Sequence, residues 1–129
     1  MTAEQVFNVE VRAGDRDIAE ELGQWLEKSG IEEVSVTRER GMIDLQALEY
    51  LISATLVELS VLARLGFWIR EKTHCRTVYD VRAKTVLTEM DCRIRDGKIV
   101  VITKKGATVY EPGTPVDLNK ILGDALGSA

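Results

Sequence analysis

Apolar and polar residues alternate at the start of the chain. Residues 5–12 have the sequence QVFNVEVR. Three of their apolar side chains fall on one side of the segment, as on a half-buried strand. Residues 16–28 change to helical spacing, and Asp15 precedes them as a candidate N-cap. Residues 32–39 return to alternation. The first forty positions therefore predict strand, helix and strand.

A long apolar run, YLISATLVELSVLARLGFWI at residues 50–69, dominates the middle of the chain. The spacing predicts a single helix over about residues 44–72, with Asp44 as its N-cap. A surface helix needs an apolar stripe only about 100° wide, and this helix is apolar over a much wider arc. The predicted helix therefore carries more apolar surface than the chain's own sheet can cover.

The remaining residues, about 76–126, predict a C-terminal β-meander and a short helix. Asp96-Gly97 fits the two central positions of a type I′ hairpin turn. In this register Ile94 lies opposite Ile99. The meander therefore adds neighbouring antiparallel strands to the sheet.

The predicted fold is a single α+β or α/β domain over residues 1–129. It has a mixed sheet of about five strands, in the order β-α-β-α-β-β-β-α, and one unusually long apolar helix over about 44–72. The closing helix covers about residues 118–126, with Asp117 as its N-cap.

Three covers are possible for the long helix: a membrane, the chain's own terminal helix and loops, or another protein chain. Glu58 and Arg64 oppose a membrane-spanning role, because a charged residue costs about 2.5–3.5 kcal/mol at the centre of a spanning helix. Large apolar patches on water-soluble proteins usually mark interfaces. The predicted contact residues lie on or beside the uncovered side: Tyr50, Val57, Glu58, Val61, Phe67 and Trp68.

Glu58 has two interpretations. It reaches the rim of the helix or pairs with an arginine of a neighbouring strand, or it sits in an interface and determines which partner binds, as buried polar groups sometimes do. The sequence leaves both open.

Composition and charge exclude some classes of protein. The chain is 45% hydrophobic, and its 17 basic and 21 acidic side chains give a net charge of −4. These charges are interspersed, which disfavours nucleic-acid binding. The N-terminal segment has no basic and apolar regions of a signal peptide. With only Cys75 and Cys92, we expect two free thiols in a reducing cytoplasm.

The sequence shows no catalytic or cofactor motif. It has no G-x-G-x-x-G, G-x-x-x-x-G-K-[ST], G-x-S-x-G or H-E-x-x-H pattern. His74, Cys75 and Cys92 lack the paired spacing of a zinc site, and Cys92 is expected to be a small core residue. We therefore predict no enzyme activity, no metal and no cofactor.

Four short segments carry a resemblance to a known family. They are LGQWLEKSG at the end of the first helix, GMID at residues 41–44, LGFWIRE at the end of the apolar run, and DGK in the predicted hairpin. With this order of elements, the chain resembles the effector-associated constant component domains of bacterial conflict systems. It departs from them by an extra strand segment around residues 76–88. The resemblance implies a non-catalytic partner domain of a defence or signalling system, without catalytic residues.

The leading hypothesis is thus a non-enzymatic interaction module that self-associates, binds an effector protein, or does both. The alternatives are a small-ligand-sensing regulatory domain and an immunity or chaperone-like protein that masks a partner. A small enzyme that uses Glu58 or His74 is a further class.

Overall fold

The structure, a computed structural model, describes residues 6–40 and 48–127, without the side chains of 39, 40, 48 and 56. These residues form seven strands and three helices. In chain order the elements are β1 (Val6–Ala13), α1 (Arg16–Lys28), β2 (Val34–Arg40), β3 (Leu48–Glu58), α2 (Leu59–Thr73), β4 (Arg76–Asp80), β5 (Thr85–Asp91), β6 (Ile99–Thr103), β7 (Gly106–Tyr110) and α3 (Pro115–Gly127).

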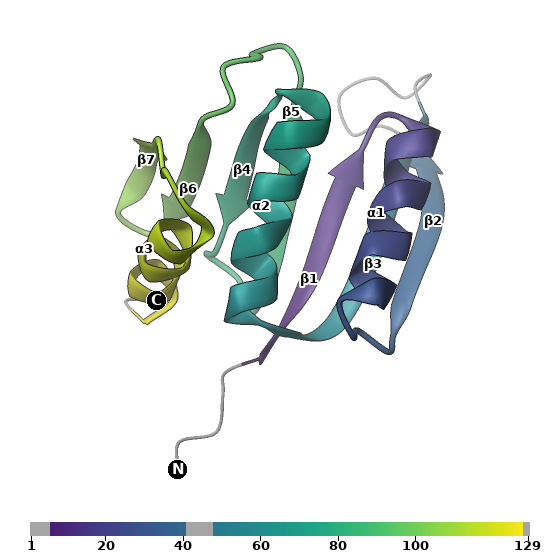
Figure 1. Ribbon diagram of the computed structural model, residues 1–129, viewed down its shortest axis with the longest axis horizontal. Coiled ribbons are helices and arrows are strands. Elements are labelled where there is room, and N and C mark those ends of the chain that lie inside the picture. The colour runs from purple at the N-terminus through teal and green to yellow at the C-terminus, as the bar shows by residue number, and fades with distance from the viewer. Residues whose placement is uncertain (1–5, 41–47, 128–129) are drawn as a thin grey trace.

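The seven strands form one mixed sheet in the order β2-β3-β1-β5-β4-β6-β7. The pairs β1–β5 and β4–β6 are parallel, and the other neighbours are antiparallel. The three helices lie side by side on the same face of the sheet (Figure 1). The described residues therefore form two layers, and the opposite face of the sheet has no helix over it.

The core fills the space between the sheet and the helices. On β1, the alternate residues Val9, Val11 and Ala13 are buried, and α1 buries Leu22 and Leu26 against them. These buried positions confirm the strand β1 predicted from alternation and the helix α1 predicted from helical spacing. β2 also lies where a strand was expected.

Side chains at the helix termini explain where two helices begin. Asp15 accepts hydrogen bonds from the backbone N–H groups of Asp17 and Ile18, which confirms it as the N-cap of α1. The N-cap predicted for the last helix is wrong. Thr114 Oγ1 accepts from the Asp117 N–H while Asp117 Oδ2 accepts from the Thr114 N–H, so α3 begins earlier than predicted, with a reciprocal capping box.

The single long helix over residues 44–72 is wrong. Residues 48–58 are strand β3, helix α2 follows directly, and residues 44–47 lie outside the described part of the chain. On β3, Ile52 and Ala54 point to the core, and α2 then buries its own apolar side on the same core. Strand and helix are joined end to end, so the two apolar patterns merge into one run.

The predicted hairpin at Asp96-Gly97 is also wrong. Gly97 has a positive φ of 66° and Asp96 is not among the described non-glycine residues with positive φ, whereas a type I′ turn needs positive φ at both. β5 and β6 are not neighbours, because β4 lies between them. Ile94 is therefore not paired with Ile99. The described residues form seven strands in the order β-α-β-β-α-β-β-β-β-α, not about five.

The two cysteines form a disulfide, contrary to the expectation of free thiols. Cys75 and Cys92 are joined by a 2.07 Å S–S bond. Cys75 is buried and Cys92 is exposed, so Cys92 is not the predicted core residue. The bond ties the start of β4 to the chain just after β5. The cytoplasmic location stays a prediction and loses the support that free thiols had provided.

Candidate functional site

The face of the sheet opposite the helices, called here the open face, has an apolar half. Thr77 and Tyr79 of β4 point into the core, so Val78 between them points to the open face. Its neighbours there follow from the strand register, which places Val78 beside Val100 and Val100 beside Val109. The apolar half of the open face comprises Val78, Leu87, Val100, Ile102, Ala107 and Val109, with Glu89 paired to Val78 and Asp80 paired to Leu87 and Ile102. Val100 lies lowest in it and is only 8% exposed.

The other half of the open face, over β1 and β3, is polar. Arg12 and Glu49 form an ion pair across these strands, with 3.4 Å between Nη1 and Oε2. Ser53 and Glu10 are paired in the strand register beside it. Both side chains of this pair are half-buried, at 24% and 34% exposed, so charged and polar groups line this half.

Strands that support the apolar half end in local Asp–Arg pairs. Arg82 binds Asp80 at the end of β4, and Arg93 binds Asp91 at the end of β5. In each pair the arginine donates hydrogen bonds to the carboxylate and lowers its pKa. Both carboxylates stay ionised near neutral pH, so they are not suited to be general acids.

A third pair ties the loop before β6 to the start of β4. Arg76 Nη2 lies 2.5 Å from Asp96 Oδ2, and this hydrogen bond is the main cause that lowers the Asp96 pKa to about 2. The Asp96 carboxylate also accepts from the Lys98 backbone N–H. Asp96 thus holds the loop that leads into the apolar half.

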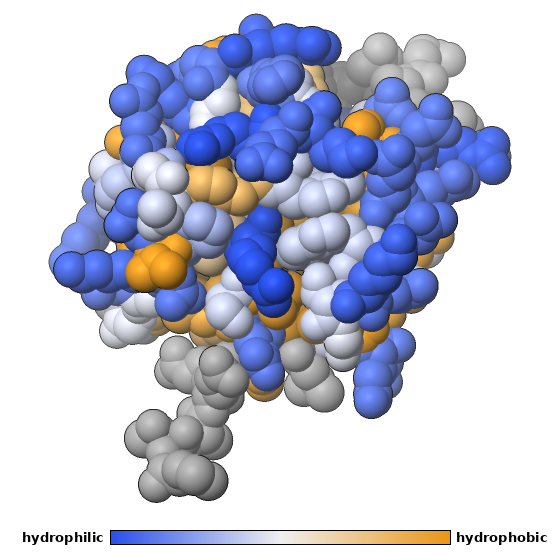
Figure 2. All heavy atoms as spheres, in the orientation of Figure 1, coloured by the Kyte–Doolittle hydropathy of each residue, from blue (hydrophilic) through white to orange (hydrophobic). Residues whose placement is uncertain are grey.

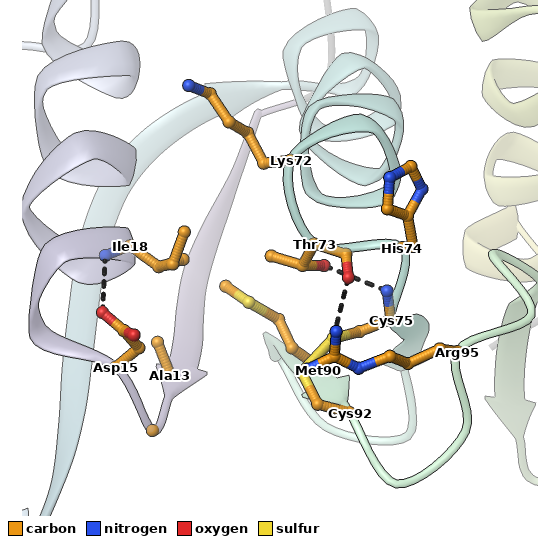
Figure 3. Close-up of a pocket in the computed structure, with 11 residues that line it drawn as sticks. Ala13, Asp15, Ile18, Lys72, Thr73, His74, Cys75, Met90, Cys92 and Arg95 are labelled. Carbon is orange, nitrogen blue, oxygen red and sulfur yellow. Dashed lines mark hydrogen bonds between the residues drawn. A yellow bond between two sulfur atoms is a disulfide. The ribbon is translucent and has the colours of Figure 1, made fainter.

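A cavity of about 450 Å³ lies between the end of β1, the first turn of α1 and the end of α2 (Figure 3). Ile18 and Met90 point toward its centre, and the disulfide forms part of its wall. Arg95 is a cationic side chain in its wall, while Lys72, which also lines it, pairs its Nζ with Glu21 Oε2 at 3.4 Å. His74 ends α2 in a left-handed conformation with φ of 57°. This arrangement suits a small anion better than covalent catalysis, because both cysteine sulfurs are already bonded to each other.

The predicted contact residues are largely inside the two layers. Val57 and Val61 are 0% and 4% exposed, so neither offers side-chain surface to a partner in this conformation. Tyr50, Phe67 and Trp68 are half-buried against the core. The expectation that the apolar run leaves an uncovered helix side is therefore not met by α2.

Both neighbouring helices account for this burial. The Trp68 and Trp25 ring centroids are 6.3 Å apart, which links α2 to α1, and Leu118 and Leu122 of α3 join the same core. The Arg70 guanidinium lies 4.5 Å from the centroid of the Phe67 ring. The outer surface of the helices is mostly hydrophilic, with small separate apolar areas (Figure 2).

Glu58 is exposed and occupies the N-cap position of α2. Its side chain makes no capping hydrogen bond. The carboxylate in the apolar run therefore marks the junction between β3 and α2, which the one-helix interpretation had hidden. Whether Glu58 contacts a partner stays a prediction.

Sequence reasoning missed the apolar half of the open face. The continuous apolar run Ile99–Ile102 does predict a strand covered on both faces. The sequence alone did not reveal that helices cover only one of those faces. The missed residues come from four strands that the register brings together.

Two further features concern metal binding and membrane insertion by residues 6–40 and 48–127. In these ranges no three His, Cys, Asp or Glu side chains gather as a metal site would require. None of the helices described has the length and apolar character needed to cross a bilayer. Comparison with known protein families, with characterised proteins and with solved structures finds no match.

Proposed function

We propose that this protein is a non-enzymatic interaction module that binds an effector protein on the apolar half of its open face. The carrying observation is that β6 presents apolar side chains on both faces, with Val78 and Val109 beside it on the open face, while the described helices cover only one face. Antiparallel sheets with one wet face normally alternate apolar and polar residues. An apolar strand surface without a layer over it is typical of a protein-binding site.

The surroundings of this surface also suit a protein partner. Protein interfaces combine an apolar centre with a polar rim. Here the polar half with the Arg12–Glu49 pair lies beside the apolar half in the same sheet. The resemblance to effector-associated constant component domains favours an effector of a bacterial defence or signalling system as the partner.

The test compares partner capture by matched variants in extracts of the native host. Val78→Thr with Ile102→Thr removes apolar surface from two half-buried residues of the open face and keeps β-branched side chains that favour strands. The control, Thr85→Val, makes the reverse exchange of a methyl and a hydroxyl group on β5. Thr85 pairs with Asn8 at the edge of the polar half. The captured protein is then purified and its affinity for each variant is measured by calorimetry.

We expect the wild type and Thr85→Val to bind alike and the double variant to bind at least about tenfold more weakly, since each of the two half-buried side chains contributes on the order of 1 kcal/mol of apolar burial. Equal affinity of all three proteins contradicts binding at the open face. Circular dichroism confirms that the variants remain folded.

The cavity beside the disulfide supports a second candidate function, small-anion sensing. Arg95 and Lys72 line it together with one acid, Asp15, and Lys72 also pairs with Glu21. A thermal-shift screen with phosphate, sulfate and small carboxylic acids tests this candidate. We expect an anion that stabilises the wild type and not the Arg95→Gln variant; equal shifts in both proteins contradict anion binding in the cavity.

A further inference from the structure

The strand at one end of the sheet, β7, has an unprotected edge. Among the described strands, β7 is last in the order and pairs with β6 alone. Its sequence, Gly106 to Tyr110, contains no charge and no proline, and four of its five residues are exposed. Proteins usually protect such edges with charges, prolines or bulges, because a free edge pairs with other strands. The opposite edge strand, β2, ends in Arg38, Glu39 and Arg40.

The register shows which backbone groups of β7 are free to pair. The N–H groups of Thr77 and Val81 donate to the carbonyls of Lys98 and Ile102, so even-numbered residues of β6 face β4. Odd-numbered residues of β6 therefore face β7. Their partners there are Tyr110, Thr108 and Gly106. It follows that Ala107 and Val109, which alternate with these partners, direct their N–H and C=O groups to the free edge.

We propose that two copies of this chain form a homodimer by antiparallel pairing of β7 with β7, about a two-fold axis through Thr108. In this register Ala107 of one copy pairs with Val109 of the other, and the reverse. Both residues have outward-directed backbone groups, so they exchange hydrogen bonds across the interface. A shift by one residue would bring in Thr108, whose backbone groups already face β6.

Charge selects this axis among those that the backbone allows. In the same register Lys105, in the turn before β7, comes nearest to Glu111 of the other copy, just beyond both ends of the paired strands. Glu111 is exposed and has a partner, Lys98, at 3.3 Å between Oε1 and Nζ; as a carboxylate it can accept from a second lysine. Moving the axis by one residue, to Ala107 or Val109, separates Lys105 from Glu111.

The apolar half of the open face becomes continuous across this interface. Val109 is 49% exposed in the single chain, and its side chain lies beside Val100 on the open face. Pairing brings Ala107 of the second copy next to it. This inference rests on the proposed function and makes it more specific, because the dimer would offer one effector-binding surface of double width.

The experiment measures the dimer dissociation constant of the full chain by sedimentation equilibrium. We expect a species of twice the 14.4 kDa chain mass. Ala107→Pro removes an outward N–H and no bond to β6, so it should abolish the dimer and leave the fold intact. A monomer at all concentrations up to about 100 μM, or a dimer that tolerates Ala107→Pro, overturns the proposal.

A charge-reversal series tests the register itself. Lys105→Glu places two acids opposite each other at both ends and should raise the dissociation constant about five- to tenfold. Lys104→Glu makes the same change in net charge, but position 104 faces Pro112 in this register, so its effect should be under about twofold. Adding Glu111→Lys to Lys105→Glu should restore the affinity. Equal effects of the Lys104 and Lys105 variants overturn the axis through Thr108.

The two proposals fail separately. A monomer that still captures an effector through Val78 and Ile102 overturns the dimer and leaves the proposed function. A dimer that is sensitive to Ala107→Pro, but whose open face captures nothing, confirms β7 pairing and contradicts effector binding.

Discussion

At the scale of single residues, one glycine shows how closely α2 lies on the sheet. The Tyr79 hydroxyl donates to the Leu62 carbonyl of α2 over 2.7 Å, and burial raises its pKa. A Cβ at Gly66 would overlap the Tyr79 hydroxyl and would lie 3.0 Å from Leu118 Cδ2. Gly66 is therefore required by close approach of the helix to β4, and the sequence gives no sign of that requirement.

This contact reverses the usual effect of replacing glycine in a helix. We predict that Gly66→Ala lowers the free energy of unfolding by about 1–3 kcal/mol through overpacking. The matched control, Gly123→Ala in α3, meets only Leu59 Cδ2 at 3.4 Å and should raise it by up to about 1 kcal/mol. Urea unfolding measures both; a stabilising Gly66→Ala contradicts the contact between Gly66 and Tyr79.

At the scale of elements, the disulfide joins the ends of two strands that are distant from each other along the sequence. Cys75 precedes β4 and Cys92 follows β5, at a sequence separation of 17. β4 and β5 pair antiparallel, so Arg76 lies opposite Asp91 and the two cysteines flank that pair. The bond thus closes one end of the β4–β5 pair, next to the cavity formed with α1 and α2.

We predict that replacing the disulfide weakens the fold without changing it. Closing a loop of this size stabilises a protein by about 3 kcal/mol in the chain-entropy model, so Cys75→Ser with Cys92→Ser should lose about 2–4 kcal/mol in urea unfolding. Mass spectrometry of the alkylated wild type provides the control. A wild-type chain that takes up two alkyl groups without reduction contradicts the disulfide.

At the scale of the whole molecule, one sheet connects both ends of the structure. The N-terminal strands β1, β2 and β3 join the C-terminal strands through the parallel pair of β1 with β5. Trp25 and Trp68 lie where α1 meets α2, and α3 covers β6 on the same face. No boundary in the sheet separates the two halves of the described residues.

We therefore predict cooperative unfolding of the oxidised protein. Tryptophan fluorescence reports the α1–α2 contact and far-ultraviolet circular dichroism reports all elements, and both should give the same urea midpoint. Measurements at several protein concentrations separate folding from dimer dissociation. Two distinct midpoints at one low concentration would show that the β6–β7–α3 end unfolds separately.

The sequence by itself determined the elements whose signal is local. Alternation along β1, helical spacing in α1 and the Asp15 cap involve neighbours within a few residues, so their pattern can be interpreted without knowing the fold. The tertiary structure decided the rest. An apolar run such as 50–69 suits a buried strand or a buried helix equally well, and only pairing of β3 between β1 and β2 selected the strand.

The candidate site on the open face is among the features that only the tertiary structure decided. Its apolar residues are separated along the chain and meet only because β4 is inserted between β5 and β6. Their exposure depends on the three helices packing on one face alone. A residue's own hydrophobicity predicts that it will be covered, but only the arrangement of all elements decides whether the chain or a partner provides the cover.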